Sequence, residues 1–106
     1  MATPESRTKA RLKKLLSEFD VYYEMPVPSG FGKSSLDFVC CARGLYLQIE
    51  TKAGNKDMTP RQRSIARQVE KAGGRAFLYN DNPKTHEELE TWLRQNIESL
   101  NNTRQS

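Results

Sequence analysis

The sequence has few of the residues on which zinc sites and disulfide frameworks depend. It contains one histidine and two cysteines among 106 residues, too few for a four-ligand zinc site of the usual kind. Cys40 and Cys41 are adjacent, so we expect two buried small hydrophobic residues in a reducing compartment, not a disulfide. No apolar run is long enough to span a membrane and no apolar signal segment follows Met1, which predicts a cytoplasmic protein.

Positive charge, in contrast, is in excess. The net charge is +4, and the basic residues concentrate before Lys14 and again from Arg61 to Arg67. These stretches indicate a polyanionic partner, although the first of them also fits a solvated helix face. The length predicts one domain, which we expect over residues 1–100, followed by a disordered tail over residues 101–106.

The spacing of apolar residues and helix caps predicts an α/β protein with the element order αβββαβα. Helices are expected over residues 3–19, from Thr59 to the glycines at 73–74, and from a capping box at Thr85, with strands over residues 21–25, 36–41, 45–49 and 75–79. The last strand follows a helix, which implies a right-handed crossover and a parallel pairing, hence a mixed central sheet flanked by helices. His86 falls in the first turn of the last helix and is predicted to be a surface residue.

Three ionisable residues interrupt the apolar hairpin formed by the second and third strands. If Arg43 and Gly44 are its two turn residues, Asp37 lies directly opposite Glu50, whereas a three-residue turn would shift the pairing by one. Like charges about 5 Å apart on paired strands are destabilising, and a divalent cation between them turns repulsion into coordination. Lys52 lies on the same strand face as Glu50 and is placed to hold a water or a phosphate beside the metal.

Asp37, followed by Glu50-Thr51-Lys52 at the end of the next strand, resembles the PD-(D/E)XK nuclease signature. Together with Thr59-Pro60-Arg61-Gln62, the sequence is most similar to the small virus-type replication-repair (VRR-NUC) nucleases, over the stretch up to about Tyr79. Leu36 stands where this family usually has a proline. The resemblance implies a single-domain, restriction-endonuclease-like core.

Further site residues follow from the resemblance. It implies that Glu5, on the first helix, completes the metal site; the alternative is a glutamate that only favours the helix dipole, and Glu24 is a second candidate. It also implies that Gln62 faces the site, although capping of the second helix explains Gln62 by itself.

The implied activity is Mg²⁺-dependent hydrolysis of DNA phosphodiesters, with Mn²⁺ expected to substitute and no other small-molecule cofactor. Asp37, Glu50 and the backbone carbonyl of Thr51 would hold one or two metal ions, and Lys52 would position the attacking hydroxide or stabilise the transition state. By the same analogy we expect a homodimer acting on branched DNA such as a Holliday junction, in the host cytoplasm if the chain is viral or from a phage. The candidate DNA contacts are Lys9, Lys13, Lys33, Arg61, Arg63 and Arg67.

Two other functions stay open from the sequence. One is a nucleic-acid-binding module without catalysis, in which the acidic pair is vestigial. The other is a protein-interaction domain without a nucleic-acid partner, which salt-independent behaviour would favour.

Overall fold

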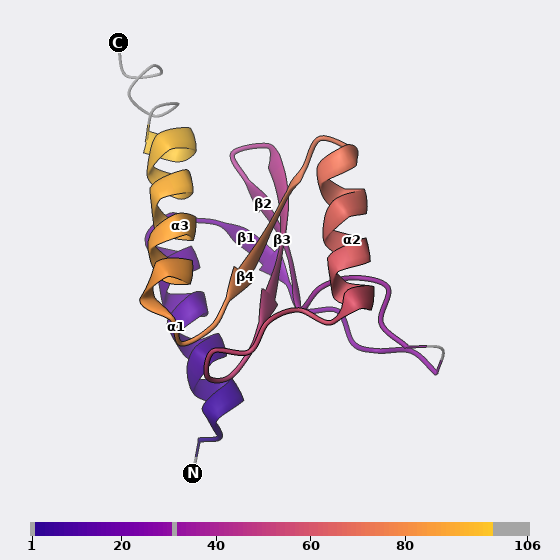
Figure 1. Cartoon of the computed structure of the whole chain (residues 1–106). Coiled ribbons are helices and arrows are strands. Elements are labelled where there is room, and N and C mark those ends of the chain that lie inside the picture. The colour runs from indigo at the N-terminus through magenta and orange to yellow at the C-terminus, as the bar shows by residue number, and fades with distance from the viewer. Residues whose placement is uncertain (1, 31, 99–106) are drawn as a thin grey trace.

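The computed structural model describes residues 2–30 and 32–98, so the tail expected over residues 101–106 lies outside the described residues. It is an α/β domain with the predicted order of helices and strands (Figure 1). The elements are α1 (Pro4–Glu18), β1 (Tyr22–Glu24), β2 (Phe38–Ala42), β3 (Leu45–Thr51), α2 (Pro60–Lys71), β4 (Arg75–Tyr79), α3 (Pro83–Leu93) and a π-helical turn, η1 (Arg94–Glu98). None of these helices has the length and apolar character needed to cross a membrane.

The sheet has the strand order β1-β2-β3-β4, with β1, β2 and β3 antiparallel and β4 parallel to β3. Ala42 pairs with Leu45 and Phe38 with Ile49, so the hairpin turn has two residues and the register that places Asp37 opposite Glu50 is confirmed. Both turn residues have positive φ, 53° at Arg43 and 87° at Gly44, as a tight hairpin turn requires. β2 begins at Phe38, later than predicted, so Asp37 precedes the strand.

The sheet is covered by α1 and α3 on one face and by α2 on the other (Figure 1). The core fills the first of these faces, because alternate strand residues such as Phe38, Leu47 and Ile49 point to it and meet the apolar stripes of the two helices. On the opposite face α2 packs on β3 and β4. The β1 side of that face is left open, where Tyr22 is 64% exposed.

Three predictions about single residues were wrong. Asn82, not Thr85, caps α3, because the Asn82 side chain accepts from the Lys84 N–H and Pro83 fits the first helical position. His86 is partly buried rather than on the surface: its Nδ1 lies 2.8 Å from the Tyr79 hydroxyl. Cys41 is exposed, because it alternates with buried Cys40 and points to the open face.

Candidate active site

The two predicted acidic residues meet at the end of the hairpin opposite its turn. The backbone N–H of Asp37 donates to Oε1 of Glu50 at 3.2 Å. Asp37 Oδ2 in turn accepts from the backbone N–H of Thr51 at 3.1 Å and from its hydroxyl at 2.7 Å. These bonds join the residue before β2 to the last residues of β3, so the hairpin register itself fixes the spacing of the two carboxylates.

Lys52 joins this pair, as predicted from the strand alternation. Its Nζ lies 3.8 Å from Oε2 of Glu50, and the two side chains are 19% and 5% exposed. Burial, followed by the charge of Asp37, raises the pKa of Glu50 to about 7. Ionising Glu50 beside Asp37 therefore costs free energy in the folded protein, and a bound cation would reduce this cost.

Asp37 has the opposite electrostatic environment. Its burial alone would raise the pKa of the carboxyl, but hydrogen bonds from Lys33 and Thr51 outweigh burial and the pKa lies below its ordinary value. Lys33 reaches Asp37 from the loop that precedes β2, and its Nζ forms an ion pair with Oδ1. Lys33 was predicted only as a DNA contact, and because residues 33–37 form a loop and not a helix, its spacing to Asp37 gave no signal for this pairing.

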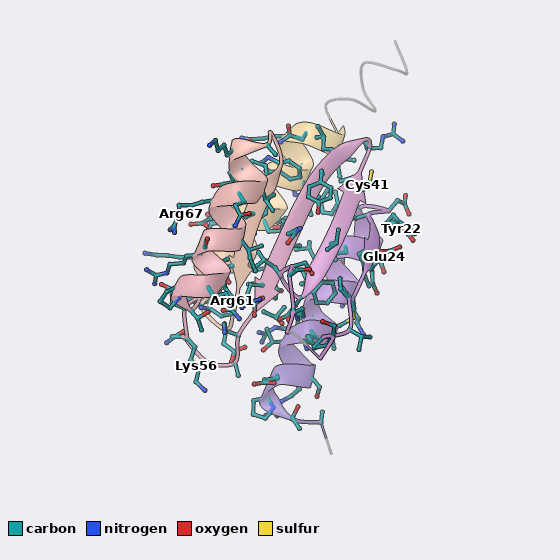
Figure 2. All side chains as sticks on the ribbon, turned by 90° about the vertical axis from the view of Figure 1, so that its right-hand side faces the viewer. Tyr22, Glu24, Cys41, Lys56, Arg61 and Arg67 are labelled. Carbon is teal, nitrogen blue, oxygen red and sulfur yellow. The ribbon has the colours of Figure 1, made fainter. Side chains whose placement is uncertain are left out.

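A pocket of about 160 Å³ opens beside the acidic pair, and its lining includes Glu5 and Lys9 from α1. Two of the predicted α1 residues, Glu5 and Lys9, thus lie at the site. Within the described part of the chain, no three His, Cys, Asp or Glu side chains gather as a metal-binding group, so Glu5 lines the pocket without joining the pair. Glu24 is elsewhere: it lies at the β1 edge and accepts from the Tyr22 hydroxyl (Figure 2).

The first turn of α2 is linked to the acidic pair through Lys33. Gln62 completes the predicted capping box with Thr59 and lines a neighbouring pocket together with Lys33 and Arg61. Capping is therefore observed for Gln62, whereas its role in the site stays a prediction. The Arg61 guanidinium donates to the Lys33 carbonyl at 3.1 Å, which ties the loop to α2.

The remaining candidate DNA contacts are spread over two helices. Arg61 and Arg67 project from the α2 side of the molecule, away from the β1 edge that carries Tyr22 and Cys41 (Figure 2). Arg63 forms an ion pair with Asp57 at 2.7 Å, and Lys13 is exposed on α1.

A wider groove of about 690 Å³ between β4 and α3, lined by Arg75 and Trp92 among others, shares no residue with the site.

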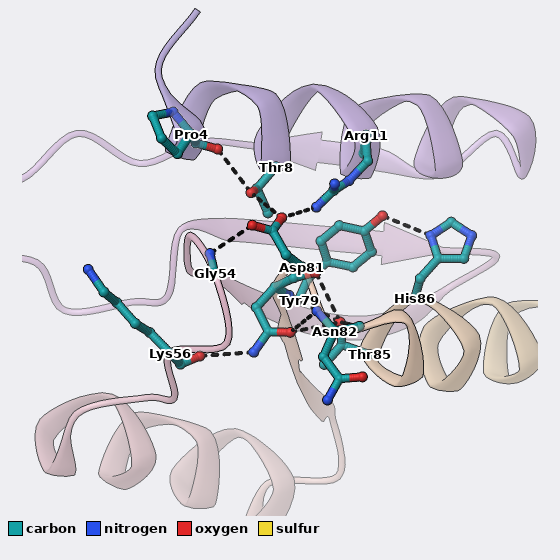
Figure 3. A network of polar contacts seen from close by, with 11 residues as sticks. Pro4, Thr8, Arg11, Gly54, Lys56, Tyr79, Asp81, Asn82, Thr85 and His86 are labelled. Carbon is teal, nitrogen blue, oxygen red and sulfur yellow. Dashed lines mark hydrogen bonds and ion pairs between the residues drawn. The ribbon is translucent and has the colours of Figure 1, made fainter.

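Asp81, which was not predicted as a site residue, holds the two flanks of the site together (Figure 3). Its carboxylate accepts from Thr8 at 3.1 Å and pairs with Arg11, both on α1, and it accepts from the Gly54 N–H at 2.8 Å. Gly54 belongs to the loop that follows Lys52, and the Asp81 N–H donates back to its carbonyl at 2.9 Å. One side chain thus fixes α1, which carries Glu5, relative to the strand end that carries Lys52.

The fold has a counterpart among solved structures. The chain is similar to a structure described as a VRR_NUC domain, with a TM-score of 0.70 over 84% of this chain and 97% of that chain, at 19% sequence identity. The chain has the fold of a VRR_NUC domain. This likeness confirms the predicted α/β fold, with the element order αβββαβα and a mixed central sheet. No protein-family model and no curated protein matches the sequence.

Proposed function

We propose that this chain is a divalent-metal-dependent endonuclease that hydrolyses DNA phosphodiesters. The observation that carries the proposal is the convergence of Asp37, Glu50 and Lys52 at one partly buried position, where the pKa of Glu50 is raised to about 7. A hairpin that served only stability gains nothing from two facing carboxylates. The VRR_NUC fold supports the same activity by analogy.

The residues present suit a hard divalent cation. Asp37 and Glu50 offer carboxylate oxygens and Thr51 a backbone carbonyl, which are the donor types that Mg²⁺ prefers and Mn²⁺ accepts. A divalent cation held there supplies Lewis-acid activation of water and neutralises charge that grows on the phosphate.

The other side chains of the site act on water and phosphate. The Lys52 ammonium, 3.8 Å from Glu50, orients the attacking water and offsets negative charge in the transition state. Glu5 and Lys9 line the pocket in which the scissile phosphate would lie, and Gln62 is a second-rank candidate for orienting it.

In this proposal the DNA backbone is bound by basic residues of α1, of α2 and of the loop before β2. Such a short chain has little surface for binding, so we propose a homodimer that acts on branched DNA, with two sites related by the two-fold symmetry of a four-way junction. A mass of one chain per bound junction, or equal cleavage of junction and linear duplex, would contradict this part of the proposal. The contacts are assigned to Lys9, Lys13, Lys33, Arg61, Arg63 and Arg67.

Plasmid nicking with Mg²⁺, with Mn²⁺ and with excess chelator tests the activity. We expect Asp37→Asn, Glu50→Gln and Lys52→Ala to abolish cleavage with little loss of DNA binding in a gel-shift assay. Glu87→Gln, an exposed change on α3, is the matched control and should cleave normally. Cleavage by Asp37→Asn or in chelator refutes the metal mechanism, while DNA binding without any cleavage favours the non-catalytic module.

A further inference from the structure

Lys33 places a positive charge on the carboxylate that we assign to the metal. Its Nζ pairs with Asp37 Oδ1, and the two side chains are only 26% and 13% exposed. The other oxygen, Oδ2, already accepts two hydrogen bonds from Thr51. Oδ1 is thus covered by an ammonium group, and an incoming cation must compete with that group for this oxygen.

The loop around Lys33 allows its side chain to leave while the backbone stays. The Lys33 carbonyl is held by the Arg61 guanidinium at 3.1 Å, which anchors the main chain to the first turn of α2. The Lys33 side chain beyond that anchor is a flexible four-carbon stem with an ammonium at its end. Because Arg61 and Lys33 line the same pocket, a released ammonium points into the basic surface that we assign to phosphate contact.

We propose that Lys33 is an internal counterion that occupies the cation position of Asp37 in the metal-free protein and moves to a DNA phosphate when a divalent ion binds. The proposal rests on the proposed function of the Asp37–Glu50 site. Metal binding then frees a phosphate ligand, and phosphate binding removes a competitor of the metal. By linkage, each ligand raises the affinity for the other by the same factor.

The first test measures Mn²⁺ binding to the full chain without DNA, by isothermal titration calorimetry at low salt. Removing the competitor in Lys33→Met should tighten Mn²⁺ binding about tenfold, equivalent to about 1.4 kcal/mol. Lys71→Met removes one charge at the far end of α2 and controls for the change in net charge; it should alter the affinity by less than about twofold. Asp37→Asn should abolish binding.

The outcomes separate the two proposals. No Mn²⁺ binding by wild type, or unchanged binding by Asp37→Asn, overturns the metal site itself. The role of Lys33 alone is overturned by a different result: wild type binds Mn²⁺, Asp37→Asn abolishes that binding, and Lys33→Met leaves the affinity unchanged or lowers it. An equal gain in Mn²⁺ affinity in Lys33→Met and Lys71→Met also overturns the role of Lys33, because the gain then comes from the change in net charge.

The second test measures the coupling. The affinity for a four-way junction is determined by fluorescence anisotropy with and without Ca²⁺, and each sample is checked on a denaturing gel for intact strands. Ca²⁺ should tighten junction binding by wild type, and the ratio of the two affinities should be several-fold smaller in Lys33→Met. Equal ratios in the two proteins overturn the transfer of Lys33 to phosphate.

Discussion

Neutralising Glu50 should stabilise the metal-free protein, and only at pH values where Glu50 would be charged. Glu50→Gln keeps the size of the side chain and the oxygen that accepts from the Asp37 N–H. It removes a carboxylate whose side chain is 5% exposed and whose pKa is raised from 4.5 to about 7. A difference of this size corresponds to about 3 kcal/mol between the folded and unfolded states.

The sign of the pH dependence follows from which state holds the proton. Near pH 4 Glu50 is protonated in both states, so wild type and Glu50→Gln should have similar free energies of unfolding. As the pH rises toward 7 the unfolded chain releases the proton first, which lowers the stability of wild type relative to the variant. The difference should be complete at about pH 8, with the variant more stable by about 3 kcal/mol.

Urea denaturation in the presence of chelator measures this difference. Trp92 packs edge-on against Phe77, with ring centroids 5.6 Å apart, and its fluorescence should report unfolding. Glu87→Gln, on the exposed face of α3, is the control and should match wild type to within about 0.5 kcal/mol. Two results would refute the burial of a costly charge at the site. Either Glu50→Gln is no more stable than wild type at about pH 8, or its gain in unfolding free energy is the same at about pH 4 as at about pH 8.

Three further experiments test the fold. Gly74→Ala should lower stability by about 1–3 kcal/mol, because its Cβ would lie 3.0 Å from a backbone oxygen, whereas Gly30→Ala, in open space, should be neutral in the same urea assay. Asp81→Asn should lower the melting temperature and weaken Mn²⁺ binding, because it loosens the contacts of Asp81 with α1 and with the loop at Gly54. An unchanged melting temperature would contradict the role of Asp81 in holding these two segments together. A thiol reagent should label exposed Cys41 in the native chain and Cys40, whose pKa burial raises to about 12, only after unfolding.

The sequence predicted those parts of the fold that follow from local chemistry. Alternating apolar residues and the Arg43-Gly44 turn determine the hairpin, and the Thr59 capping box marks the start of α2. The convergence of Asp37 and Glu50 followed from the same pattern, because opposite residues in a hairpin are fixed by the turn.

Local sequence patterns did not predict contacts between distant segments. Asp81 joins residues 70 or more positions away on α1, and nothing in the spacing of Thr8 and Arg11 predicts it. The burial of Glu50 also depends on tertiary structure: strand alternation puts Glu50 on the face opposite Leu47 and Ile49, and only the folded chain shows that Glu50 is 4% exposed there. Such burial raises the pKa of Glu50, so the electrostatics of the site emerge only from the folded chain.

The hairpin turn therefore controls chemistry at the other end of the strands. A shift of one residue in the pairing would turn Glu50 to the core face and move Leu47 and Ile49 off that face, which would leave an ionised carboxylate in the core without a partner. The two-residue turn prevents this shift, and it can form only because the chain adopts positive φ at Arg43 as well as at the following glycine. The left-handed conformation at Arg43 is unfavourable for a residue with a Cβ, so the stability of the paired strands must hold it in place. The acidic pair and the turn that aligns it are, in this sense, one structural unit.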